Sequence, residues 1–84
     1  MPEGPFHYRP DVLEHLWHHG IQPTAHTPPG LVRDFIRDLY KYEIRRLRDR
    51  MLRNEFPRGE YAGRVDALRR CYQVLALQPR QFVD

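Results

Sequence analysis

The sequence lacks serine altogether and contains a single lysine, a single asparagine and a single cysteine. Without serine, the chain cannot supply a serine nucleophile, which excludes that class of covalent catalysis. The one cysteine, Cys71, excludes an internal disulfide and any zinc or iron–sulfur site built from several cysteines. We expect Cys71 to be a small residue at the edge of a helical core.

Long apolar stretches are missing as well. No run approaches the roughly 18 residues that a membrane-spanning helix requires. The first ten residues, MPEGPFHYRP, contain no apolar segment of the signal-peptide kind. The sequence therefore predicts a cytoplasmic protein that does not contact a membrane.

Arginine, by contrast, is abundant. Thirteen of the 14 basic residues are arginine, and the formal net charge is +3. This usage is typical of a GC-rich bacterial genome, and it also suits planar contacts with carboxylate or phosphate groups. The length of 84 residues, 40% of them hydrophobic, predicts one domain, residues 1–84, with a small core.

Residues 1–29 differ in composition from the rest of the chain, because they hold six of the eight prolines and all five histidines. We expect an arm that is largely extended, interrupted by one short helix over about residues 10–19. Pro10 suits a first helical turn, and Gly20 suits the left-handed position that follows a helix. The apolar residues of this helix are Val12, Leu13, Leu16 and Trp17.

Residues 30–76 are predicted to form a helical hairpin. Thr27 is the expected N-cap of its first helix, which ends near Leu52, and Asn54 can take the left-handed conformation after it. The early apolar residues of this helix, Leu31, Val32, Phe35, Ile36 and Leu39, are expected to face the N-terminal arm. The later ones face the second helix of the hairpin, because apolar residues recur at matched spacings of three and four in both. These residues are Tyr40, Ile44, Leu47 and Met51, and then Tyr61, Val65, Leu68, Tyr72 and Leu75.

The last eight residues, 77–84, read LQPRQFVD and are interrupted by Pro79. We expect them to form an extended tail. The predicted fold class is therefore all-α: a short N-terminal helix and an antiparallel hairpin of long helices, with a proline-rich arm and an extended tail.

The stretch LRDRMLRNEFPRGEYAGRVDALRR, residues 47–70, resembles the short helical hairpin of the SHOCT type. Asn54 stands where that pattern has glycine, and Phe56 stands where it has isoleucine. The other matching positions are Glu60 and Tyr61, then Arg64 and Leu68, whereas Pro57 departs from the usual threonine cap. The resemblance implies a non-catalytic module that mediates oligomerisation or association.

Three histidines lie in the segment EHLWHHG, residues 14–20. His15 and His19 are four residues apart and could chelate a transition metal from one helix face, with His18 nearby and His7 or His26 as a further ligand. The alternative is that these imidazoles interact with the bare carbonyl groups and the dipole at a helix C-terminus. We favour the second interpretation, and we expect no metal and no cofactor.

Other catalytic arrangements are lacking. Asp34 and Asp38 lie one turn apart among basic residues, a pattern of exposed ion pairs rather than of an acid–base dyad. The glycines match no phosphate-binding loop. The sequence therefore predicts that the chain is not an enzyme.

A basic stripe follows the first hairpin helix, since residues 33–70 hold 12 basic and seven acidic side chains. Such a stripe can follow nucleic-acid phosphates, or it can be a solvated face that Asp34 and Asp38 partly neutralise. Its members are Arg33, Arg37, Lys41, Arg45 and Arg48.

Several large apolar side chains outside the hairpin are more than a small core can hide, unless they fold back onto the first hairpin helix. They are Phe6, Tyr8, Trp17 and Phe82. With the basic stripe, they are the candidate partner-binding residues. We expect a non-catalytic protein–protein interaction module, a small accessory or oligomerisation subunit of a larger bacterial complex, that binds a larger protein subunit or itself. The alternative is an RNA- or DNA-binding protein, for example a ribosome-associated one, and a lesser alternative is a metal-binding protein based on His15, His18 and His19.

Overall fold

The computed structural model describes residues 5–84, so the first four residues of the expected arm lie outside the described part. No β-strand occurs among residues 5–84, which confirms the predicted all-α class. Nor does this part contain a helix long and apolar enough to cross a membrane. The α-helices are α1 (Pro10–His18), α2 (Pro29–Leu52) and α3 (Tyr61–Arg70), and the 3-10 helices are η1 (Arg58–Glu60), η2 (Gln73–Ala76) and η3 (Pro79–Gln81).

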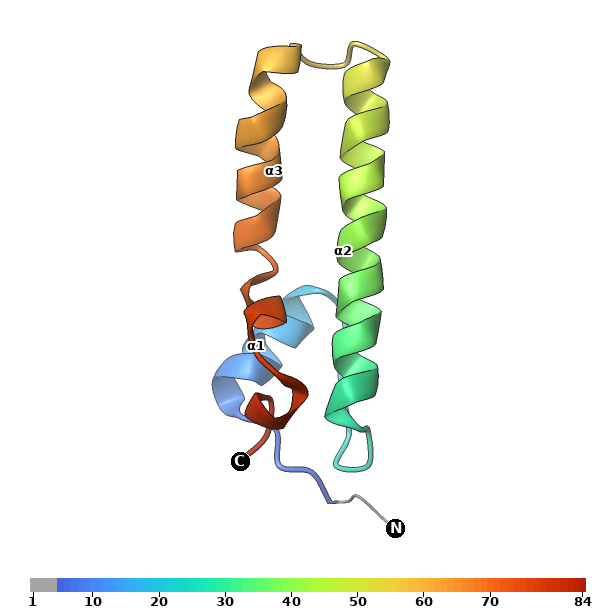
Figure 1. The fold of residues 1–84 in the computed structure, drawn as a ribbon. Helices are drawn as coiled ribbons and strands as arrows, with labels where there is room; N and C mark the ends of the chain where they lie inside the picture. Colours follow the sequence, from blue (N-terminus) through green and yellow to red (C-terminus); the bar gives the residue numbers. More distant parts are fainter. Residues whose placement is uncertain (1–4) are drawn as a thin grey trace.

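Helix α2 is the longest helix of residues 5–84, and the other elements lie along it (Figure 1). Helix α3 lies beside its second half and runs back in the opposite direction, while α1 and the C-terminal segment gather beside its first half (Figure 1). The described residues are elongated, with extents of 50 × 20 × 19 Å. One end of the molecule is therefore several elements thick, whereas the other end consists of α2, α3 and the turn between them, which contains η1.

The core lies at the thick end, where α1, the first half of α2 and the C-terminal segment meet. Seven buried residues form one cluster there: Val12, Leu16, Val32, Ile36, Tyr72, Val74 and Phe82. Towards the hairpin turn, only Leu47 and Phe56 are buried among the apolar residues. The packing that holds the fold together is thus concentrated at one end, and the hairpin projects from it.

Helix α1 begins with Pro10 at its first position and ends at His18, followed by Gly20 with a φ of 75°. The N–H of Ile21 donates to the carbonyl of Leu16 over 2.9 Å, which closes the helix end. Trp17 does not belong to the buried stripe of α1, because 56% of its surface is exposed. Val12 and Leu16 alone form the fully buried part of that stripe.

Thr27 is not the N-cap of α2, because Pro28 occupies that position. The carbonyl of Thr27 instead accepts a hydrogen bond of 2.6 Å from the hydroxyl of Tyr8, and this bond ties the N-terminal arm to the start of α2. At the other end, Asn54 takes the left-handed conformation, with a φ of 60°. The N–H of Glu55 then donates to the carbonyl of Arg50 over 3.0 Å.

Helix α3 is shorter than its apolar pattern predicts, because the α-helix stops at Arg70 and not near residue 76. Tyr72 leaves the helix with φ −118° and ψ 34°, and η2 follows. The chain changes direction at this point, and η2 and η3 lie beside the first half of α2 (Figure 1). The change in direction at Tyr72 places Val74 in the core cluster.

The C-terminal residues are not an extended tail. They form η3, in which the N–H of Gln78 donates to the side-chain oxygen of Gln81 over 2.7 Å. Phe82 follows and is fully buried. Its carbonyl accepts from the N–H of Arg9 over 2.9 Å, so the tail lies against the N-terminal arm.

Two glycines give opposite predictions for the same substitution. Gly20 has a positive φ of 75°, so we expect Gly20→Ala to lower the free energy of unfolding by about 1 kcal/mol. Gly63 lies within α3 in ordinary helical conformation, with open space where a Cβ would stand. Gly63→Ala should therefore raise the free energy of unfolding by roughly 0.5–1 kcal/mol. Urea unfolding followed by circular dichroism measures both, and a shift in the same direction for the two variants would contradict these conformations.

Candidate interaction surface

Besides Leu52 at its end, α2 exposes three large apolar side chains to solvent: Leu31 at 62%, Phe35 at 59% and Tyr42 at 54%. At about 100° per residue, their spacing places them within about 40° of one another around the helix. We call these three residues the apolar face of α2. Sequence reasoning assigned Leu31 and Phe35 to the core and did not single out Tyr42. Periodicity could not predict this exposure. Leu31 and Phe35 each precede a buried residue of the same apolar pattern, Val32 and Ile36, and the pattern does not distinguish the two members of each pair.

The aromatic candidates predicted from the sequence do not gather on one surface. Phe82 is a correction, because it is 0% exposed and belongs to the core cluster. Tyr8 is half-buried, and burial raises the pKa of its hydroxyl. Phe6 is half-buried, and its N–H donates to the carbonyl of Ala25 over 2.6 Å. Trp17, at 56% exposure, is the member of this set that remains available to a partner.

The basic stripe divides into three parts. Arg33 is a correction: its half-buried guanidinium donates to the carbonyls of Leu77 over 2.9 Å and Leu75 over 2.8 Å, so it holds η2 and the tail against α2. Arg37 is exposed and pairs with acidic neighbours of α2, Asp34 over 3.3 Å and Asp38 over 3.5 Å. The remaining members are exposed and form no ion pair within residues 5–84; they are Lys41, Arg45 and Arg48.

A groove open to solvent runs between α2 and α3 near the thin end of the molecule. Its apolar lining consists of Leu47, Ala67 and Leu68, with Cys71 at one end. The polar lining consists of Glu43, Arg46, Arg50 and Arg64. We call these eight residues the open groove.

The open groove continues into a second hollow at the end of α1. The two share Glu43, Arg46, Leu68 and Cys71. The additional lining residues of the second hollow are His18, His19, Leu39, Tyr42 and Tyr72. Tyr42 therefore connects the open groove with the apolar face of α2.

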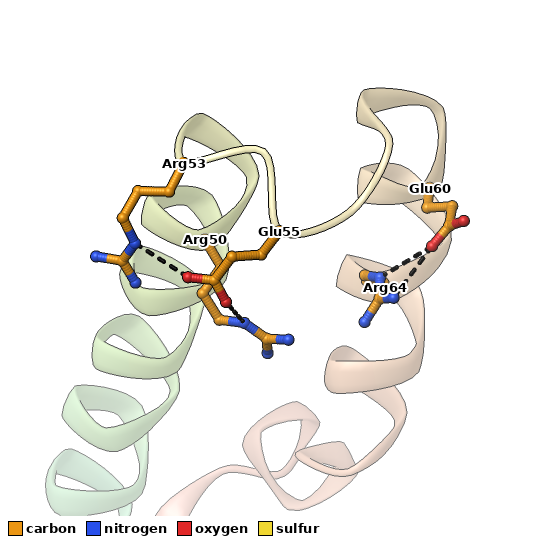
Figure 2. A network of polar contacts seen from close by, with 5 residues as sticks. All are labelled: Arg50, Arg53, Glu55, Glu60 and Arg64. Atoms are coloured by element: carbon orange, nitrogen blue, oxygen red, sulfur yellow. Dashed lines mark hydrogen bonds and ion pairs between the residues drawn. The ribbon is translucent and has the colours of Figure 1, made fainter.

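Ion pairs fix the arginine side chains at the closed end of the hairpin (Figure 2). The carboxylate of Glu55 forms ion pairs with the guanidinium groups of Arg50, at 3.1 Å, and Arg53, at 3.0 Å. The carboxylate of Glu60 pairs with the guanidinium of Arg64 at 3.1 Å. Hydrogen bonds from Arg53, and then from Arg50, lower the pKa of the Glu55 carboxyl. The groups in Figure 2 are exposed, so each pair adds little to stability, but together they orient two of the three arginines of the open groove.

The guanidinium groups of Arg50 and Arg64 also approach the ring of Phe56. Their Cζ atoms lie 5.8 Å and 4.2 Å from its centroid. Phe56 is buried and fills the closed end of the hairpin. The arginines thus cover an apolar ring with their planar groups while their outer nitrogens remain at the surface.

Tyr72 joins the end of the open groove to the core. It is 3% exposed, and its hydroxyl donates to the carboxylate of Glu43. Burial, followed by the bond to Glu43, raises the pKa of Tyr72 well above its usual value. Because Glu43 accepts this bond, its charge is directed inward and is less available to a ligand in the groove.

The three histidines considered as metal ligands are separated. His19 stacks on Tyr72 with ring centroids 4.2 Å apart, and its Nε2 lies 2.7 Å from the carbonyl of Cys71. His15 lines a different hollow beside Asp11 and Glu14, and His18 lies at the edge of both hollows. Within residues 5–84, no three or more His, Cys, Asp or Glu side chains are grouped so that they could hold a metal ion.

Cys71 is exposed, so the expectation that it belongs to the core is wrong. The α-helix ends at Arg70, just before it, and the change in direction there turns the following residue, Tyr72, into the core in its place.

Comparison with known proteins provides no relative: no family model, no curated protein and no solved structure matches this chain. Functional inference therefore depends on the surface just described.

Proposed function

We propose that this chain is a non-catalytic protein–protein interaction module, a small accessory or oligomerisation subunit of a larger bacterial complex. The observation that carries the proposal is the apolar face of α2, in which Leu31, Phe35 and Tyr42 are each more than half exposed. Large apolar and aromatic side chains grouped on one helix face are typical of surfaces that another subunit covers.

The distribution of the core supports the same proposal. The buried cluster lies at one end, and the projecting hairpin buries only Leu47 and Phe56 among its apolar residues. Two helices that bury so few apolar side chains between them are stabilised when a partner packs against them. The resemblance of residues 47–70 to SHOCT hairpins also favours an association module over an enzyme.

Nucleic-acid binding is a second candidate, because one group of cations remains uncompensated. Lys41, Arg45 and Arg48 are exposed, and no ion pair involves them within residues 5–84. Three side chains at intervals of three and four residues on one helix could follow successive phosphates. Binding through three phosphate contacts would weaken with salt at a slope of roughly −2 to −3 in log K against log salt concentration.

The test is affinity capture of the tagged full chain from its native host, with and without nuclease, using the wild type and two variants. We expect a stoichiometric protein that survives nuclease and is lost with Phe35→Ser. The matched control is Leu52→Ser, because Leu52 is also exposed, at 51%, but lies at the other end of α2.

Both variants replace exposed side chains, and circular dichroism checks that they fold. Capture that disappears with nuclease would favour the second candidate. A stable monomer that captures no protein in stoichiometric amount would contradict the proposed function.

A further inference from the structure

Helix α1 packs only at the thick end of the molecule, where Val12 and Leu16 join the core cluster. It has nine residues, about 14 Å, whereas α2 has 24 residues, about 36 Å. Where α1 ends, His18 and His19 line the hollow that leads into the open groove. Beyond this point, α2 and α3 extend side by side, and the further element of residues 5–84 against them is η1, at the turn that joins them (Figure 1).

Helix α1 is a short amphipathic helix that packs at the thick end of the molecule. Its sequence, PDVLEHLWH, contains Asp11 and Glu14 but neither lysine nor arginine, and it buries Val12 and Leu16. Helix α2 contains seven basic and four acidic residues, and α3 contains three basic residues and one acidic residue. A short amphipathic helix therefore packs against α2 through its apolar residues, while Asp11 pairs with Arg9 and no ion pair joins α1 to α2 or α3 within residues 5–84.

The lining of the open groove combines apolar and basic side chains. Leu47 and Leu68 form an apolar floor, and the short side chain of Ala67 leaves room for an approaching helix. Three arginines and one glutamate carry the charge of its lining. Glu43 accepts a hydrogen bond from the hydroxyl of Tyr72, while Arg50 and Arg64 pair with Glu55 and Glu60, which lie outside the lining. Arg46 forms no ion pair within residues 5–84, so its guanidinium can receive a carboxylate.

We propose that the open groove binds an acidic amphipathic helix of a partner protein, which continues the layer begun by α1 and completes a three-helix packing. This inference depends on the proposed function and specifies the partner's chemistry. A second copy of the chain fits less well, because its α2 and α3 are basic and would repel Arg46, whose charge no carboxylate compensates within residues 5–84. Its α1 is acidic, but Val12 and Leu16 are already buried in its own core.

The probe is a fluorescein-labelled 18-residue peptide with leucines along one helix face and glutamates beside them. A second peptide carries lysine in place of every glutamate. Fluorescence anisotropy with the purified full chain should show saturable one-to-one binding of the acidic peptide, about tenfold or more tighter than the basic peptide. Equal binding of the two peptides, or no binding of the acidic one, would overturn the charge complementarity that the inference requires.

Two matched pairs of variants test the location. Ala67→Glu places a charge in the open groove, and Ala62→Glu places the same charge about 140° away around α3. Arg46→Glu and Arg48→Glu make the same comparison on α2, about 160° apart. We expect the two groove variants to weaken the acidic peptide about tenfold and the two controls to change its affinity less than about twofold.

The single cysteine supplies an independent readout. Cys71 is exposed and lies at the end of the open groove, so a bound helix should slow its reaction with a thiol reagent such as dithionitrobenzoate. We expect protection of about fivefold or more at saturating acidic peptide and none with the basic peptide, since the exposure of the thiol sets its reaction rate. Full reactivity of Cys71 in the saturated complex would place the peptide elsewhere and contradict the inference.

The same variants separate this inference from the proposed function. If the captured host protein is retained by Ala67→Glu and Arg46→Glu but lost with Phe35→Ser, the interaction module stands and the groove inference fails. If no protein is captured from the host at all, the proposed function itself fails. Sedimentation that shows a dimer broken by Ala67→Glu would identify a second copy as the occupant and overturn the acidic partner.

Discussion

Phe82→Ala should lower the free energy of unfolding by about 3–5 kcal/mol, the largest effect expected for a single side chain here. Phe82 is 0% exposed and lies in the core cluster with α1 and the first half of α2. Truncation removes the buried ring and leaves a cavity that the surrounding residues fill only in part. Urea unfolding measures the change, and Phe82→Leu, which keeps most of the volume, should lose roughly 1–2 kcal/mol and remain folded.

The matched control is Phe35→Ala on the apolar face of α2. Phe35 is 59% exposed, so the same substitution should change stability by less than about 0.5 kcal/mol. The two phenylalanines exchange the roles predicted for them from the sequence, where Phe82 was a partner-binding candidate and Phe35 a buried residue. Similar losses of stability for the two variants would contradict this assignment.

Arg33→Met should lower the free energy of unfolding by about 2–3 kcal/mol, because the half-buried guanidinium donates to two backbone carbonyls. Methionine keeps the apolar stem but leaves the carbonyls of Leu75 and Leu77 without these donors. Loss of this bridge also frees η2 and the tail from α2, so amide hydrogen exchange in residues 75–82 should accelerate together with the loss of stability.

Arg37→Met is the control for charge, since Arg37 lies one turn further along α2 and forms only exposed ion pairs with Asp34 and Asp38. We expect it to cost less than about 1 kcal/mol. Arg33→Lys keeps the charge but lacks the planar group that reaches both carbonyls, so its stability should lie between wild type and Arg33→Met. Equal effects of Arg33→Met and Arg37→Met would contradict the bridging role.

Local signals in the sequence anticipated where several elements begin and end. Pro10 opens α1, Gly20 and Asn54 take left-handed conformations after α1 and α2, and α2 extends to Leu52. These features depend on the backbone preferences of a few neighbouring residues, and such preferences hold in most tertiary contexts. The all-α class likewise follows from the helical periodicity of the apolar residues.

The length of α3 and the shape of the tail could not be predicted in the same way. The apolar spacing continues through Tyr72 to Leu75, but the α-helix stops at Arg70. After that end, Tyr72, Val74 and Phe82 pack with Val12 and Leu16, which are distant in sequence. The spacing of apolar residues within one helix does not show where elements distant in sequence will pack.

The candidate site shows the same division. Periodicity alone identified the residues of α2 that share a face, and composition alone identified the basic stripe. Arg33 and Arg37 are equivalent in the sequence, yet the first bridges the tail and the second faces solvent, because only Arg33 lies opposite the carbonyls of η2 and the tail. The sequence by itself determined the helices and the charge of their surfaces. Tertiary packing decided which apolar residues of α2 are covered and which groove stays open. The reason is that the covering elements are distant in the chain, and α1, with nine residues, is much shorter than α2, with 24.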